Sequence, residues 1–384
     1  MSTSTSLENV LSWSRSLSTI VARPQFPIAL IGVFLNVFHL FILTRRSMRT
    51  YATNVLLIGI AVSDLVILSY YVYGGINVMG QNNQESLLQW LVESTLFTPV
   101  FSSSTPPATW FSVLFTWISK AFRDVFRRVS AWLGLLLALV RFLVVKFSRK
   151  GKLTSLTKVS TSWKICFITL LISSMVSSLN FGRMCITEFE PWTPDESCLE
   201  YPPNSSFPFY LLNENNFFSP YNEIITERFL LIDGALKIIP PASYPVFAVL
   251  LILEVRRAKK RRRFLRKGKT EENATKLVTL MTLSYLLVDT PIGLSYWLQL
   301  LFINDFYLPI IISNFVILFV TAQLFNCSLH VSICILLSSQ YRATVVKLFY
   351  RGKQEVCRLY FYEASDNQIP LQMRPVTPPI FTVT

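Results

Sequence analysis

The sequence predicts an all-α protein, a bundle of seven helices that cross a membrane, and three observations support this fold class. Of the 384 residues, 52% are hydrophobic and only 15% are charged, whereas about a quarter of an average soluble domain is charged. Long apolar segments recur along the chain, and a helix needs about 20 such residues to cross a bilayer. Basic residues collect in alternate connections between these segments, which is the pattern of a multi-pass membrane protein.

Seven segments are candidate membrane-spanning helices, because a helix satisfies its own backbone hydrogen bonds in lipid. Five of them contain at most one charged residue, an aspartate: 24–44, 53–79, 165–182, 277–303 and 306–341. The other two are less apolar: 229–253 carries two charged residues, Asp233 and Lys237, and 110–146 carries seven. After the last span, residues 338–349 place apolar side chains on one face and Arg342 and Lys347 elsewhere, which predicts a short amphipathic eighth helix on the membrane surface.

The connections alternate in charge and so predict the orientation. The first, third and fifth are basic, and the second and fourth are acidic. Basic loops stay on the cytoplasmic side, so we expect an extracellular N-terminus at 1–23, a membrane domain at 24–350 and a cytoplasmic, disordered tail at 351–384. The first twenty residues lack the features of a cleavable signal peptide. The net charge of +14 is spread over these loops and does not indicate nucleic-acid binding.

Three positions are candidates for covalent modification. Cys185 and Cys198 share the second outside loop, where they either bridge each other or remain thiols. Asn204 begins a glycosylation sequon in the same loop, and this short motif also recurs by chance. Cys357 follows the eighth helix and is either palmitoylated or an unmodified thiol.

Five stretches, in order, resemble the rhodopsin-like G-protein-coupled receptors. They are LNVFHLFILTRRSMRTYATNVLLIGIAVSDLV, FRDVFRRVSAWLGLLLALVRFLVVK, KIIPPASYPVFAVLLILEVRRAKKRRR, TKLVTLMTLSYLLVDTPIG and NCSLHVSICILLSSQYRATVVKLF. The chain is most similar to the nematode serpentine receptor class W chemoreceptors, which look related to FMRFamide-type neuropeptide receptors. The resemblance covers 26–349. It implies a rhodopsin-like bundle in the plasma membrane, a peptide or small-molecule ligand from outside, and a heterotrimeric G protein as partner.

Polar residues lie within the apolar spans, where lipid exposure of an ionised side chain would cost several kcal/mol. We therefore expect Asn36, Asp64 and Asn326 to face inward and to bond to one another. The resemblance implies that this cluster switches on activation and often holds a sodium ion, with Asp64 as its ligand; purely structural packing is the alternative. His330 stands where relatives carry tyrosine, and we expect an interhelical hydrogen bond there rather than a pH-sensitive switch.

Two further features carry over from the resemblance. Arg141 matches the arginine of the family's Asp-Arg-Tyr signature, although the triplet here reads Val-Arg-Phe. The resemblance implies that Arg141 contacts the C-terminal helix of the G protein. The alternative is that Arg141 is an ordinary snorkelling side chain at the membrane boundary. Pro240 and Pro291 align with prolines that bend helices in the family.

A ligand site is predicted from buried charges. Arg127 lies 14 residues before Arg141, about 21 Å further out along a helix. Arg123 is one turn from Arg127, so the two share a face and are candidates to bind an acidic group of a ligand or of the chain itself. Asp233 is a third candidate, four residues before Lys237. A purely internal salt-bridge network is the alternative, which we favour for Arg128 and Lys237.

Other function classes find less support. A seven-helix ligand-gated channel or transporter is the main alternative, yet the sequence shows no internal repeat or pore-lining polar stripe. With two histidines and no recognisable catalytic motif, the chain is not expected to be an enzyme. No cofactor is expected besides the sodium ion.

Overall fold

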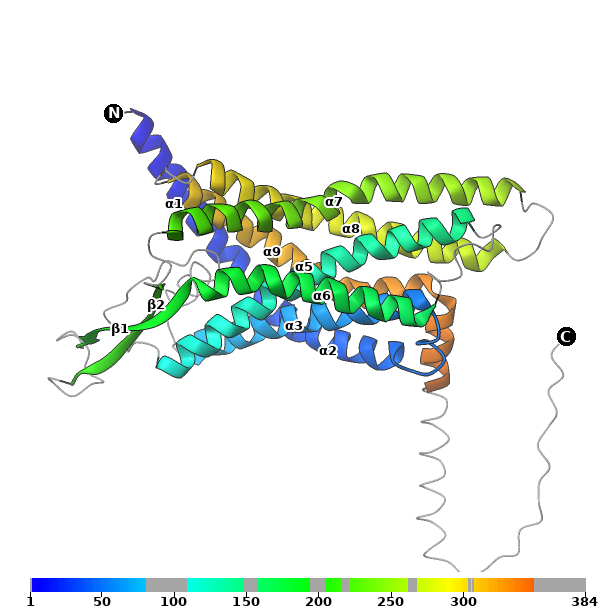
Figure 1. Ribbon diagram of the computed structural model, residues 1–384, viewed down its shortest axis with the longest axis horizontal. Helices are drawn as coiled ribbons and strands as arrows, with labels where there is room; N and C mark the ends of the chain where they lie inside the picture. The colour runs from blue at the N-terminus through cyan, green and yellow to red at the C-terminus, as the bar shows by residue number, and fades with distance from the viewer. Residues whose placement is uncertain are drawn as a thin grey trace, which may run out of the picture.

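The computed structural model describes residues 2–80, 109–147, 158–193, 205–215, 221–261, 268–302, 305 and 307–348. In this part of the chain, long helices pack into one bundle (Figure 1). Seven of them correspond to the predicted spans: α2 (Gln25–Leu43), α3 (Ala52–Gly80), α5 (Trp110–Phe147), α6 (Val159–Gly182), α7 (Asn222–Arg261), α8 (Gly268–Leu301) and α9 (Leu308–Leu337). The predicted all-α fold of seven transmembrane helices is confirmed.

Hydropathy identifies long apolar stretches among the described residues. Five described stretches are long and apolar enough to cross a membrane: Leu7–Leu43, Ala52–Ile76, Val159–Gly182, Glu227–Glu254 and Leu308–Leu337. Helices α5 and α8 complete the bundle, and α5 has the most buried charged side chains of the described helices: Lys120, Arg123, Arg127 and Arg128.

The first of these stretches includes α1 (Ser2–Ala22), a helix that we did not expect from the sequence. Leu11, Ser14 and Ser18 are buried along one face of α1. This face packs against α9, where Asn314 Nδ2 donates a hydrogen bond to Ser14 Oγ at 3.0 Å. The first apolar helical stretch therefore starts at Leu7 instead of residue 24.

A β-hairpin lies at one end of the bundle, which we call the hairpin end (Figure 1). Its strands are β1 (Met184–Trp192) and β2 (Phe207–Glu214), which pair antiparallel with Met184 opposite Glu214. Phe189 and Phe209 face each other across the strands, with ring centroids 6.2 Å apart. Such cross-strand aromatic pairs stabilise a hairpin, so the described part of the connection between α6 and α7 contains a β-hairpin.

A short helix over residues 339–348 turns across the opposite end of the bundle, which we call the basic end (Figure 1, orange). Tyr341 is buried, and its hydroxyl lies 3.0 Å from His39 Nδ1 on α2. Arg342 is exposed and donates hydrogen bonds to the carbonyls of Ile335 and Leu336, which end α9. The predicted amphipathic eighth helix is confirmed, and it is held to the bundle at both α2 and α9.

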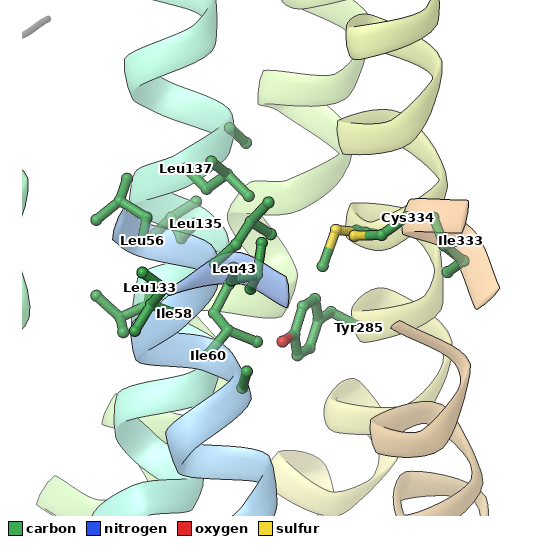
Figure 2. Close-up of a cluster of buried hydrophobic side chains, with 14 of the residues drawn as sticks. Leu43, Leu56, Ile58, Ile60, Leu133, Leu135, Leu137, Tyr285, Ile333 and Cys334 are labelled. Carbon is green, nitrogen blue, oxygen red and sulfur yellow. The ribbon is translucent and has the colours of Figure 1, made fainter. Parts of the chain in front are cut away.

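The main hydrophobic core fills the half of the bundle near the basic end. Figure 2 shows Leu43, Leu56 and Leu133 from α2, α3 and α5, with Tyr285 of α8 and Cys334 of α9 beside them. Pro240 lies inside α7 and Pro291 inside α8, as the sequence indicated. Whether these prolines bend their helices stays a prediction.

Candidate functional site

A buried polar network lies between α3, α5, α8 and α9. Asp64 Oδ2 is 2.6 Å from His330 Nδ1, and Ser130 donates a hydrogen bond to Asp64 Oδ1 at 3.1 Å. The Ser130 hydroxyl also lies 3.1 Å from the hydroxyl of Tyr285. All four residues are at most 4% exposed. The expected interhelical hydrogen bond of His330 is therefore present, and its partner is the aspartate that the sequence singled out.

The other two polar residues of the expected cluster have different contacts. Asn36 Nδ2 donates to the backbone oxygens of Gly32 and Cys327, at 3.0 and 3.1 Å. Asn326 is buried, and its Oδ1 has no hydrogen-bond partner among the described residues. The expectation that Asn36, Asp64 and Asn326 bond directly to one another is thus corrected. The side chains of Ser130 and His330 contact the Asp64 carboxylate instead, and Asn36 bonds to backbone oxygens of α2 and α9.

The contacts of the Asp64 carboxylate do not favour the binding of a sodium ion. His330 Nδ1 already holds one carboxylate oxygen, and the Ser130 hydroxyl holds the other. Among the described residues, no group of three or more His, Cys, Asp and Glu side chains is placed to bind a metal ion. Sodium binding at Asp64 stays a prediction that these contacts do not favour.

A buried ion-pair network joins α5 to α6 and α7. Arg128 pairs with Asp233 Oδ1, and Lys237 pairs with Asp233 Oδ2. Arg128 also donates to the backbone oxygen of Ser173 at 3.0 Å and to the hydroxyl of Ser177. Both oxygens of Asp233 are occupied by the protein's own cations, so this network is internal, as we favoured for Arg128 and Lys237. A ligand contact of Asp233 stays a prediction.

Arg123 also has partners within the protein. Its Nη2 lies 2.9 Å from Asp124 Oδ1, and its guanidinium lies 4.6 Å from the centre of the Tyr70 ring. The side chain is 6% exposed. Arg123 is thus satisfied by a neighbouring carboxylate and a ring of α3, and its predicted ligand contact is untested.

Arg127 differs from both of its basic neighbours. It is 6% exposed, yet its Nη2 atom has no hydrogen-bond partner in the described part of the chain. Asp289 on α8 is within electrostatic reach of the guanidinium, but no ion pair between the two is formed. Instead, Asp289 Oδ1 accepts a hydrogen bond of 3.3 Å from Gln323 of α9. A buried cation with an unpaired N–H group is costly, and an anionic partner would offset this cost.

Arg141 lies toward the basic end of α5. Its Nη2 donates a hydrogen bond of 3.0 Å to the hydroxyl of Thr53 at the start of α3. The family's usual acidic neighbour is absent from the Val-Arg-Phe triplet, and the Thr53 hydroxyl holds the arginine toward α3.

Several sequence predictions fall outside the described residues. These are the partner of Cys185 in the proposed disulfide (Cys198), the glycosylation site Asn204, the palmitoylation site Cys357 and the tail at 351–384. Cys185 itself lies in β1. All of them stay predictions.

The sequence did not single out Ser130, Tyr285, Gln323 or Thr53. A signal existed for Ser130, because it precedes Arg141 by 11 residues, about three helical turns on one face. Tyr285 and Gln323 are also polar groups in apolar spans. Their partners lie more than 30 positions away in the sequence, so only the packing of the helices could identify the contacts.

These features define a multi-pass helical membrane protein with a polar network in its core. A family comparison then identifies the group: the chain matches the family of serpentine type 7TM GPCR chemoreceptors, Srw, over residues 24–352. The chain belongs to this receptor family, which confirms the resemblance seen in the sequence. No match was found among curated proteins.

Proposed function

We propose that this protein is a plasma-membrane receptor that binds an extracellular ligand bearing an acidic group and activates a heterotrimeric G protein. The observation that carries the ligand class is the buried Nη2 atom of Arg127, which lacks a partner among the described residues. An arginine offers a carboxylate two parallel hydrogen bonds. An acidic group of the ligand would therefore accept the hydrogen bond that Arg127 Nη2 does not make to any described residue.

The charge balance around Arg127 supports an anionic ligand. Among the described residues, six basic side chains are buried against three acidic ones: Lys120, Arg123, Arg127, Arg128, Arg183 and Lys237 against Asp64, Asp233 and Asp289. Because charges inside a membrane protein are costly without partners, a net positive interior favours the entry of a negative group.

Helix α5 offers a physical route from the ligand to the G protein. Arg127, Ser130 and Arg141 all lie on this helix. Ser130 contacts both Asp64 and Tyr285, so a movement of α5 at Arg127 would alter contacts with α3 and α8. We propose that this movement releases Arg141 from Thr53 and opens the basic end to a G protein.

Charge also supports the orientation. The connections at the basic end carry Arg45, Arg46 and Arg49 after α2, and Arg256 and Arg257 near the end of α7. Basic connections remain in the cytoplasm. We therefore place the basic end inside the cell and the hairpin end outside, so that the ligand enters near β1 and β2.

The test is G-protein activation in cells that express the surface-tagged chain. The ligands to screen are small carboxylic acids, matched neutral amides and esters, and amidated neuropeptides. The Arg141→Ala variant, at equal surface expression, is the coupling control. We expect an acid to activate the receptor and Arg141→Ala to abolish the response. A ligand-evoked current without G-protein activation would instead identify a ligand-gated channel.

A further inference from the structure

A second candidate binding site lies at the basic end, away from the polar network. It is a surface cavity of about 500 Å³ lined by Arg46, Arg49, Thr50, Val159 and Trp163. Its walls come from two places: the turn that follows α2 and the first residues of α6. Cavities of about 300–1,000 Å³ are the usual size of small-ligand sites.

The turn that carries both arginines is held firmly in place. Met48 is 1% exposed, its N–H donates to Arg45 O at 2.8 Å, and its carbonyl accepts from Asn54 Nδ2 at 2.9 Å. Gln340, from the helix over 339–348, donates to Ser47 O at 3.1 Å. The cavity wall is therefore preorganised, which reduces the entropy lost when a ligand binds.

The cavity has a strong positive charge without a compensating acid. Residues 44–54 and 158–164 contain no aspartate or glutamate, and neither Arg46 nor Arg49 forms an ion pair with any acidic side chain that the structure describes. Lys158 and Lys164 add further positive charge at the start of α6. Arginines in pairs bind phosphate groups through charge-assisted hydrogen bonds.

The start of α6 adds to this preference for an anion. Helix α6 is 24 residues long, and its N-cap residue Lys158 makes no side-chain capping hydrogen bond. The N–H groups of an uncapped first turn and the helix dipole both favour a negative group. Val159 and Trp163, which line the cavity, belong to this first part of α6.

The cavity also borders the lipid-facing surface. On α6, Trp163, Phe167 and Leu171 are 50%, 66% and 50% exposed, and they follow one another at intervals of four residues on one face. An apolar stripe thus runs from the cavity along the helix toward the middle of the membrane. A molecule with a phosphorylated head and hydrocarbon tails matches both parts of this surface.

We infer that this cavity binds the phosphorylated headgroup of an anionic membrane lipid, with the acyl chains lying along α6. Arg46 and Arg49 hold the phosphate groups, and Trp163 lies at the boundary between the headgroup and the chains. Basic pockets between transmembrane helices on the cytoplasmic side are suited to such headgroups. The choice of the inner leaflet rests on the orientation that we propose above.

The experiment measures lipid binding to the purified full-length protein in neutral phosphatidylcholine nanodiscs. The probe is short-chain phosphatidylinositol 4,5-bisphosphate, and the key comparison is Arg49→Gln against Arg45→Gln. Both variants lose one charge from the same turn, but Arg45 does not line the cavity and lies over the Phe41 ring, 4.0 Å from its centre. We expect Arg49→Gln to weaken binding about tenfold, the loss of one charge-assisted hydrogen bond, and Arg45→Gln to have little effect.

Two further comparisons test whether the bound molecule is a membrane lipid. Trp163→Ala is expected to weaken binding of the lipid but not of soluble inositol trisphosphate. Equal weakening of lipid binding by Arg45→Gln and Arg49→Gln would indicate attraction to general surface charge. Binding of the soluble headgroup as tight as binding of the lipid would indicate a free-phosphate site. Either result overturns the inference. Because both arginines are exposed, equal melting temperatures are expected for all arginine variants. No receptor ligand or G protein is present in the assay, so its failure leaves the proposed receptor function standing.

Discussion

The carboxylate of Asp64 on α3 and the imidazole of His330 on α9 are in direct contact, with 2.6 Å between Oδ2 and Nδ1. Both side chains are at most 2% exposed. The contact joins two helices whose sequence segments are 266 residues apart. It also places a histidine against the buried acid of the bundle.

The first prediction concerns the two histidines. His330→Phe keeps an aromatic ring but leaves the buried Asp64 carboxylate with only the Ser130 hydroxyl as partner, which should cost about 3 kcal/mol of unfolding free energy. His39→Phe removes only the contact with the neutral Tyr341 hydroxyl and should cost about 1 kcal/mol. The measurement is thermal unfolding of the detergent-solubilised protein.

A double variant sharpens that comparison. Adding Asp64→Asn to His330→Phe removes the uncompensated charge, so part of the lost stability should return. Equal losses of stability in the two histidine variants, without recovery in the double variant, would show that the Asp64–His330 contact stabilises the protein no more than the His39–Tyr341 contact does.

The second prediction concerns resting activity. Thr53→Val keeps the shape of the side chain but removes the oxygen that accepts a hydrogen bond from Arg141. Because this contact holds Arg141 toward α3, we expect higher G-protein activation without ligand. The measurement is basal activation at equal surface expression, with Thr44→Val as the control, since the Thr44 hydroxyl bonds only to its own helix. Unchanged basal activity in Thr53→Val would contradict a restraining role.

The third prediction concerns the packing of α2. A Cβ atom on Gly32 would lie 2.5 Å from Ser328 Oγ and 2.9 Å from a methyl group of Leu68. Gly32→Ala should therefore force α2, α3 and α9 apart and cost about 1–3 kcal/mol. Gly182→Ala is the matched control, because nothing lies within 4 Å of its added Cβ atom. Melting temperatures of the two variants test this, and an equally stable Gly32→Ala protein would argue against close packing here.

Much of the fold was predictable because lipid imposes a simple rule on sequence. A spanning helix must be long and apolar, so the segments that became α2, α3, α6 and α9 could be recognised one at a time. Helix α5 was also recognised, although Arg128 and its other charges make it less apolar; its partners, such as Asp233, come from other helices.

The elements that the sequence did not reveal depend on contacts with distant residues. In α1, the buried face alternates apolar residues, Leu11 and Ala22, with the serines Ser14 and Ser18, and Ser14 is bonded to Asn314, so its apolar stripe is interrupted. The β-hairpin depends on the pairing of β1 with β2 across a long connection. In the site, the residue types indicated which polar side chains would be buried. They did not indicate that His330 would be a partner of Asp64.

Arg127 is proposed to bind an acidic group of the ligand, and the Arg127→Gln variant tests this role most directly. Arg127→Gln removes a buried cation whose Nη2 has no partner among the described residues, so stability should be kept or increased. Arg128→Gln should lower stability, because Asp233 and Ser173 lose a donor. This contrast separates a binding role from a structural one.

The measurement is the potency of an activating acid on Arg127→Gln receptors at equal surface expression. We predict a loss of about a hundredfold, the value of a charge-assisted hydrogen bond of about 2–3 kcal/mol, with no such loss for a neutral amide of the same ligand. Unchanged potency of the acid, with normal expression and stability, would contradict the claim.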